Sequence, residues 1–242
     1  MNTIDRRQWL KTAGLSSGFT FLGGFGAFAS QIEKSNYFEK SSIAKLNSNE
    51  NPYGPSKAVR EVIKNSLDIA CRYPSMVLHP LVEQIAQKEG VTKDHIVITG
   101  GSTEGLKAAG LTYGLNGGEI IAADPTFQSL MTYAENFGAT VHRVPVDKNM
   151  GHDLIEMEKR ITTKTGLIFI CNPNNPTGTL LDKNILRDFC ASVSSRTMVF
   201  SDEAYYDFIT EPDYPSMIEL VKENMNVIVS KTFSKVYGLA GL

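Results

Sequence analysis

The amino-acid sequence predicts an α/β protein whose mostly parallel sheet is covered by helices on both faces. From residue 94 onward, short apolar runs alternate with segments whose apolar residues recur at helical spacing. Strands that alternate with helices favour parallel pairing, because each helix returns the chain to the same edge of the sheet. Ligands of such sheets bind at the carboxyl ends of the strands. The turns that follow the strands are therefore the expected place for a site.

The composition is that of an ordinary globular protein and argues against several functional classes. Of the 242 residues, 42% are hydrophobic and 21% are charged, with a net charge of −2. Lysine and arginine form no basic block, so we expect no nucleic-acid partner. The three cysteines and four histidines have no metal-ligand spacing, and an odd number of cysteines argues against a disulfide framework. We therefore expect no metal site.

Residues 1–29 resemble an export signal. The segment 5–11, Asp-Arg-Arg-Gln-Trp-Leu-Lys, is close to the twin-arginine pattern, and an uncharged run leads to an Ala27-Phe28-Ala29 cleavage site. A membrane anchor or a core helix is the alternative, but this run is short for a span and rich in glycine. The sequence therefore predicts periplasmic export, with no stable membrane span after cleavage. A cytoplasmic location is the alternative, and residues 30–44 resemble a polar linker.

Residues 45–93 are expected to form an N-terminal arm. The segment 46–56 is dense in turn residues and amides, which predicts a loop. Ser56 is expected to cap a helix over 57–68, because serine accepts hydrogen bonds from the first free N–H groups of a helix. A turn at 72–74 and a second amphipathic helix over 78–89 complete this arm.

Residues 94–242 predict six strands, with helices between them. The expected strands are 96–99, 119–123, 140–146, 167–170, 197–200 and 227–229. The expected helices are 104–115, one from after Phe127 to about 137, 153–161, one capped by Asp182 that runs to about 193, and 216–223. Unusual turns follow five of the strands, at 100–104, 124–127, 171–178, 201–205 and 230–235.

Two of these turns offer groups that bind charge. Gly100-Gly-Ser-Thr103 opens a helix and presents amides and hydroxyls to an anion, although it matches neither a Walker A loop nor GxGxxG. A plain strand–helix turn is the alternative. Asp202 ends an apolar strand, so it is expected to be buried and to need a cation or hydrogen-bond donors. A magnesium ligand is the alternative there, but it would require a phosphate loop that this sequence lacks.

Three other turns complete the set. Phe127 could stack on a planar ring, although an aromatic residue of the core is the commoner case. Asn172, Asn174 and Asn175 belong to a loop that two prolines hold in shape, so any of these amides could face a ligand. The amine of Lys235 could form a Schiff base, and the hydroxyls of Thr232 and Ser234 could hold a phosphate; a solvated loop lysine is the alternative. Together these groups describe a pocket for pyridoxal phosphate (PLP).

Three motifs, in their order and spacing, resemble the class I/II aminotransferases of the aspartate aminotransferase fold. They are Asn172-Pro-Asn-Asn-Pro-Thr-Gly178, Asp202-Glu-Ala-Tyr205 and Ser234-Lys-Val-Tyr-Gly-Leu-Ala-Gly-Leu242. Leu46-Asn-Ser-Asn-Glu-Asn-Pro52 and Arg72-Tyr-Pro74 are most similar to the histidinol-phosphate aminotransferase branch. The resemblance covers about residues 45–242, which comprise the arm (45–93) and an incomplete PLP-binding large domain (94–242).

The resemblance implies a role for each candidate residue. Lys235 would bind PLP covalently and then transfer protons, while Asp202 would pair with the pyridine nitrogen. Asn175 and Tyr205 would donate hydrogen bonds to the phenolic oxygen of the ring, and Phe127 would stack on its face. The phosphate would be held by Ser102, Thr103, Thr232 and Ser234. Tyr73 would reach a phosphate of the neighbouring subunit, which implies a homodimer, and Asn49 would line the substrate entrance.

The sequence departs from the family pattern at two places. Leu130 stands where the family often has a tyrosine, three residues after the stacking aromatic. The chain also ends at Leu242, before an arginine, an inserted antiparallel strand and a small C-terminal domain that the family pattern contains. The resemblance therefore implies a fragment or a C-terminally truncated chain.

The implied function is that of a PLP-dependent aminotransferase. It would move an amino group between an amino acid or amino-phosphate, histidinol-phosphate-like or aromatic, and a 2-oxo acid such as 2-oxoglutarate. A PLP-dependent decarboxylase or lyase of the same fold is one alternative, and an inactive truncated product is another. Export counts against histidinol phosphate itself as the substrate, because that pathway is cytoplasmic.

Overall fold

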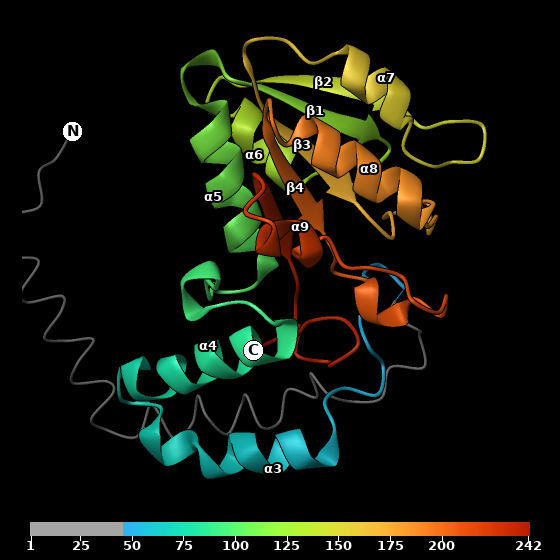
Figure 1. The fold of residues 1–242 in the computed structure, drawn as a ribbon. Helices are drawn as coiled ribbons and strands as arrows, with labels where there is room; N and C mark the ends of the chain where they lie inside the picture. Colours follow the sequence, from blue (N-terminus) through green and yellow to red (C-terminus); the bar gives the residue numbers. More distant parts are fainter. Residues whose placement is uncertain (1–45) are drawn as a thin grey trace, which may run out of the picture. The chain divides into compact units, whose positions relative to one another are not determined.

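Five parallel strands form one sheet in the computed structural model, which describes residues 46–242 (Figure 1). They are β1 (Glu119–Asp124), β2 (Thr140–Pro145), β3 (Thr165–Cys171), β4 (Met198–Asp202) and β5 (Val227–Ser230). The order across the sheet is β2-β1-β3-β4-β5, and every neighbouring pair is parallel. The predicted fold class is confirmed, with five of the six expected strands.

The register aligns the carboxyl ends of the strands that precede three of the unusual turns. Cys171 of β3 lies opposite Asp202 of β4, which in turn lies opposite Ser230 of β5. The chain leaves the sheet at the same level in all three strands. The turns at 171–178, 201–205 and 230–235 therefore meet at one edge.

The prediction of a strand at 96–99 was wrong. Its backbone is extended, with φ −108° and ψ 126° at Ile96, but it pairs with none of the described strands. The side chain of Val97 is 82% exposed. An apolar run favours an extended backbone locally, whereas a strand also needs a neighbour that accepts and donates its backbone hydrogen bonds.

Helices cover both faces of the sheet, as predicted. On one face lie α5 (Ser102–Gly114) and α6 (Ser129–Glu135), and on the other α7 (Leu154–Lys159), α8 (Lys183–Val193) and α9 (Ile218–Lys222). Alternate residues of β3 divide between the two cores: Leu167 and Phe169 pack with α5 and α6, while Ile168 and Ile170 pack with α7, α8 and α9. Burial on both faces explains why β3, in the middle of the sheet, is apolar over residues 167–170.

The arm contributes two helices, α3 (Lys57–Asn65) and α4 (Ser75–Glu89). Ser56 caps α3 as predicted, its hydroxyl accepting a hydrogen bond from Val59 N at 3.3 Å. Asp182 caps α8 in the same way, through Asn184 N and Ile185 N. Short 3-10 turns occupy Leu67–Ile69, Lys93–His95, Leu115–Gly117 and Tyr206–Phe208. The first of them replaces the end of the helix that was expected over 57–68.

The predicted export signal at 1–29 and linker at 30–44 lie outside the described residues. Within 46–242, no helix is long and apolar enough to cross a membrane. Over the same residues all three cysteines are free, and no group of side chains has the composition of a metal site. Residues 49–242 pack as one unit, and all contacts discussed below lie within it.

Candidate active site

Asp202 is a buried carboxylate at the end of β4, as the sequence predicts. The residue is 3% exposed, and Ala204 N donates a hydrogen bond to its Oδ1 at 3.2 Å. This is the one hydrogen bond that its side chain receives from residues 46–242. Burial raises the pKa of Asp202 to about 6, although the Ala204 N–H and the charge of Lys235 act in the opposite direction. Asp202 is therefore a carboxylate short of partners, which a cationic ligand would stabilise.

Lys235 and Tyr205 both contact Asn49, a residue far away in the sequence. Lys235 Nζ donates a hydrogen bond to the Asn49 carbonyl oxygen at 3.0 Å, and Asn49 Nδ2 donates to the Tyr205 hydroxyl at 2.9 Å. Lys235 Nζ also lies 5.6 Å from the centroid of the Tyr205 ring. The structure thus brings together three of the predicted site residues around the loop that begins the arm.

A close backbone contact holds this loop against the segment after Lys235. Asn51 Nδ2 donates a hydrogen bond to Val236 O at 2.9 Å. Gly238 has φ +73°, and a Cβ at this position would lie 2.4 Å from the carbonyl carbon of Gly54. Only glycine fits such a backbone angle and such an approach without strain. The glycine of the third motif therefore has a local role, which is to let the two loops touch.

Replacing Gly238 by alanine is expected to lower the free energy of unfolding by about 1–3 kcal/mol, because it adds strain at positive φ and a clash with the backbone. Gly241→Ala is the matched control, since a Cβ at Gly241 would meet nothing within 4 Å. Urea unfolding of both variants measures the difference. Equal stability of the two would contradict the proposed contact.

The three asparagines of the 171–178 loop have different roles. Asn172 and Asn174 are buried and fully engaged within the protein. Asn172 Nδ2 donates to the Tyr214 hydroxyl at 2.7 Å and its Oδ1 accepts from Leu181 N at 3.0 Å. Asn174 Oδ1 accepts from the Thr126 hydroxyl at 2.7 Å, which joins the loops after β1 and β3. These two side chains shape the loop, and Asn175 remains as the amide that can reach a ligand.

Asn175 lies between two cavities. One, of about 590 Å³, is also lined by Asn49 and Tyr205. The other, of about 680 Å³, is also lined by Phe127, whose partly buried ring packs against the core beside α5 and α6. The nearby Leu130, where the family often has a tyrosine, is fully buried in that core. It therefore has a packing role rather than a contact with either cavity.

The predicted phosphate residues form two pairs. Ser102 and Thr103 are the first residues of α5, so their N–H groups have no acceptor within the helix. Next to them, Glu104 accepts a hydrogen bond from Gly100 N, so the chain's own carboxylate occupies part of this turn. In the second pair, Thr232 Oγ1 donates to Ser234 Oγ at 3.0 Å and accepts from Ser234 N at 3.1 Å. The N–H groups of the first pair and the hydroxyl hydrogen of Ser234 in the second remain as donors for an anion.

Comparison with known proteins decides the family. A family model described as aminotransferase class I and II matches residues 41–242. The chain belongs to this aminotransferase family. Its members use PLP, and the aspartate-aminotransferase-like fold expected from the motifs is confirmed.

Similar proteins include aminotransferases of two named activities. The chain is 41% identical over 201 residues to a histidinol-phosphate aminotransferase of Moorella thermoacetica, covering 83% of this chain and 52% of that protein. It is 39% identical over 198 residues to an aromatic amino acid aminotransferase of Streptomyces avermitilis, covering 82% and 55%. The structure of a Sinorhizobium meliloti histidinol-phosphate aminotransferase in complex with pyridoxal-5'-phosphate matches with a TM-score of 0.74 and 25% identity, covering 80% and 52%. The chain thus spans about half the length of the curated relatives it matches.

The residues of this aminotransferase chain fit PLP by their chemistry. The Asp202 carboxylate is buried with a single donor, which suits a protonated ring nitrogen. Lys235 offers the amine, Asn175 and Tyr205 offer donors beside the cavity, and the two hydroxyl pairs suit a phosphate.

One predicted residue stays apart from this group, and others were not predicted at all. Tyr73 is 94% exposed and joins none of the contacts described above. The sequence analysis missed Thr126, which fixes Asn174, and Glu203, which is buried next to Asp202. Two consecutive carboxylates after an apolar strand were the signal for Glu203, because a charged residue in such a place needs partners.

Proposed function

We propose that the protein containing this chain is a PLP-dependent aminotransferase. The observation that carries the proposal is the buried Asp202 carboxylate at the carboxyl edge of the sheet. It receives one hydrogen bond, and the charge of Lys235 acts to lower its pKa. A buried carboxylate with raised pKa beside an amine is the arrangement that a cationic aromatic cofactor would complete. Membership of the family supports this conclusion.

PLP, when bound, supplies a ring that withdraws electrons from the amino carbon of the substrate. Asp202 keeps a proton on the ring nitrogen, because the ionised carboxylate stabilises the positive charge of that nitrogen. Lys235 holds the cofactor through its amine and moves a proton at Nζ. Asn175 and Tyr205 would donate hydrogen bonds to the ring oxygen, and Phe127 would pack against the ring.

Four residues are proposed to bind the phosphate group of PLP. They are Ser102, Thr103, Thr232 and Ser234. The start of α5 contributes N–H groups and a positive helix end, which favour an anion. The hydroxyl pair after β5 adds side-chain donors.

The proposed substrates are an amino acid or amino-phosphate, histidinol-phosphate-like or aromatic, and a 2-oxo acid such as 2-oxoglutarate. The names of the similar proteins support both donor classes. The test is to incubate the PLP-loaded protein with 2-oxoglutarate and either histidinol phosphate or phenylalanine, and to measure glutamate. Glutamate formed with either donor supports the proposal. Release of carbon dioxide without glutamate would instead indicate a decarboxylase, and no reaction with any amine donor would contradict both.

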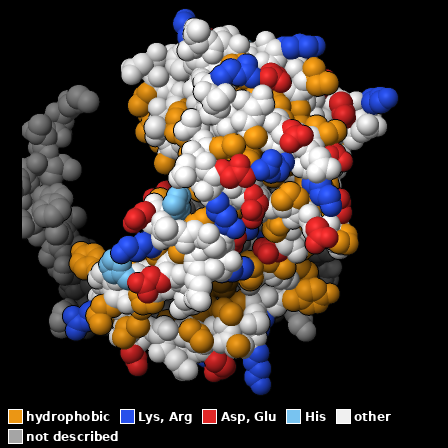
Figure 2. Space-filling model, in the orientation of Figure 1, with side chains coloured by type: hydrophobic (Ala, Val, Ile, Leu, Met, Phe, Trp, Pro, Cys, Tyr) orange, Lys and Arg blue, Asp and Glu red, His pale blue; other side chains and the backbone are white. Residues whose placement is uncertain are grey.

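We also propose that the protein is a homodimer. Large apolar side chains are exposed on α3, on α4 and between them, where Figure 2 shows hydrophobic groups at the surface. Leu67 is 65% exposed, Tyr73 94% and Met76 88%. A cluster of this kind favours burial against another surface, and Tyr73 would then reach the site of the second subunit.

Analytical ultracentrifugation at micromolar concentration is expected to give the mass of a dimer for the unsubstituted protein, called the parent below. The double variant Leu67→Glu/Met76→Glu is expected to be mostly monomeric. The reason is that two buried charges without partners disfavour the interface. An exposed apolar residue of α8, changed in Ile185→Glu, is the control. A monomeric parent, or a dimer that withstands the double change, would contradict this arrangement.

A further inference from the structure

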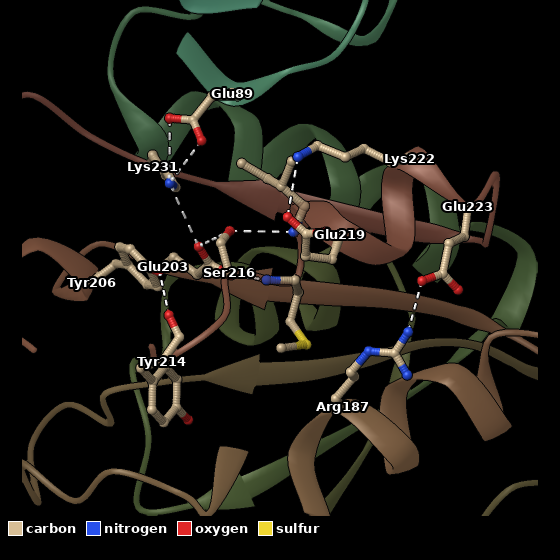
Figure 3. A network of polar contacts seen from close by, with 12 residues as sticks. Glu89, Arg187, Glu203, Tyr206, Tyr214, Ser216, Glu219, Lys222, Glu223 and Lys231 are labelled. Atoms are coloured by element: carbon tan, nitrogen blue, oxygen red, sulfur yellow. Dashed lines mark hydrogen bonds and ion pairs between the residues drawn. The ribbon is translucent and has the colours of Figure 1, made fainter. Parts of the chain in front are cut away.

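Glu203 is a second buried carboxylate, next to Asp202 in the sequence but engaged with other residues. It is 4% exposed. Its Oε2 accepts a hydrogen bond from the Ser216 hydroxyl at 2.6 Å, and its Oε1 accepts from Met217 N at 2.7 Å (Figure 3). These contacts hold the segment that leads into α9 against the end of β4.

Lys231 is the cation nearest to this carboxylate in the described part of the chain. Its Nζ lies 3.9 Å from Glu203 Oε2 and 3.2 Å from Oε2 of Glu89, the last residue of α4. Nζ also lies 4.6 Å from the centroid of the Tyr206 ring. Figure 3 shows Lys231 between the two carboxylates. One amine therefore connects the arm, the end of β4 and the turn after it.

The backbone places this pair beside both residues proposed to act on PLP. Glu203 directly follows Asp202, and its N–H donates to Ser230 O at 2.8 Å. Lys231 directly follows Ser230 and starts the turn that leads to Lys235. The Glu203–Lys231 pair therefore joins the first residues of the two turns that carry Asp202 and Lys235.

The buried carboxylate has a physical reason to need a nearby positive charge. Burial raises the pKa of Glu203 to about 7, while the Ser216 hydroxyl, the charge of Lys231 and Met217 N–H act to lower it; the charge of Glu89 raises it. Without Lys231, the buried carboxylate would lose its nearest positive charge. Lys231 is partly exposed, so its pairing with Glu89 alone would contribute little.

We propose that Glu203 and Lys231 are positioning residues, whose ion pair fixes the turn carrying Lys235 against the end of β4 carrying Asp202. Glu89 ties this pair to α4. The inference rests on the proposed function, because the geometry that it sets is that of the PLP site. Neither residue needs to touch the cofactor.

The test compares variants that remove or retain the charges in the PLP-loaded protein. Lys231→Met keeps the aliphatic stem over Tyr206, Lys231→Arg keeps the charge, and Glu203→Gln keeps the shape. Arg187→Met is the matched control, because Arg187 pairs with Glu223 at 2.7 Å between α8 and α9 and touches neither turn. The measurements are the dissociation constant of PLP and the visible circular dichroism of the bound cofactor, which reports its orientation.

Lys231→Met and Glu203→Gln are each expected to weaken PLP binding by about tenfold or more, the scale of a lost charged contact. They are also expected to reduce the visible dichroism. Lys231→Arg and the control Arg187→Met should both keep the PLP affinity and the dichroism of the parent. The double variant Lys231→Met/Glu203→Gln removes both charges of the Glu203–Lys231 pair together and should bind PLP no more weakly than either single variant. If one single variant does not fold, the PLP affinity of the double variant is compared with that of the other single variant.

Two outcomes would overturn the inference. One is that the folded variants retain the affinity and dichroism of the parent. The other is that the two single effects simply add in the double variant. A parent protein that binds no PLP at Lys235 would instead refute the proposed function, so the two failures are distinguishable.

Discussion

Lys235→Ala is expected to remove the visible absorbance of bound PLP and to lower the rate of transamination by about 10³-fold or more. In the proposed function the amine both holds the cofactor covalently and transfers a proton, and the loss of a proton-transfer group alone costs about 10²–10⁴-fold. Lys235 Nζ lies at the carboxyl edge of the sheet, where it donates a hydrogen bond to Asn49 O at 3.0 Å.

Lys222→Ala is the control for this experiment. Lys222 pairs with Glu219 on the surface of α9 at 3.1 Å and contacts none of the proposed site residues. The control should keep both the absorbance and the rate of the parent. Visible absorbance that survives in Lys235→Ala would show that another group holds the cofactor.

Asp202→Asn is expected to lower kcat by about 10²–10³-fold, the usual scale for removing one electrostatic contact with the reacting system. The amide has the shape of the carboxyl group but no negative charge, so it cannot keep a proton on the ring nitrogen. Asp207→Asn, an exposed aspartate of the same segment, is the control. A variant at position 202 with normal kcat would contradict the role of the carboxylate.

Asp202→Asn is also expected to change how the free energy of unfolding depends on pH. Burial raises the pKa of Asp202 from its usual 3.8 to about 6 in the protein without cofactor. The folded state therefore binds the proton more tightly than the unfolded state, and stability falls as pH rises between these two values. A shift of this size corresponds to about 3 kcal/mol, which Asp202→Asn should recover above pH 6. Glu203 contributes in the same direction and is retained in the variant.

PLP binding is expected to have the opposite pH dependence, because in the proposed function the cofactor favours the ionised carboxylate. The affinity of the parent should decrease as pH falls through about 6. The affinity of Asp202→Asn should be lower overall and flat in this range. Fluorescence titrations with PLP across the pH range measure both. An affinity of the parent that rises on acidification would contradict the assignment of the titrating group.

Most of the sheet was predictable because each strand is marked locally. Apolar runs such as 167–170 are buried on both faces, and polar or small residues end them. The burial of Asp202 followed from the same pattern. The segment 96–99 has the same local mark, but its pairing depends on a neighbour that the pattern cannot reveal.

The contacts that complete the site could not be predicted, because they join distant parts of the chain. Asn49 meets Tyr205 across 156 positions, and Lys231 meets Glu89 across 142. Residue type and position alone could not separate Asn174 from Asn175, because adjacent amides in one loop look alike until their partners are known; only the resemblance to the family singled out Asn175. Thr126, the partner that distinguishes them, lies 48 positions earlier.

Identification of the residue that binds PLP tests the central claim most directly. The PLP-loaded protein is reduced with borohydride, which makes the link to a lysine permanent, and is then digested and analysed by mass spectrometry. We expect the cofactor's mass on the peptide that contains Lys235, at Lys235 itself and not at the neighbouring Lys231. Attachment at Lys231 or at any other lysine, or no attachment at all, would contradict it.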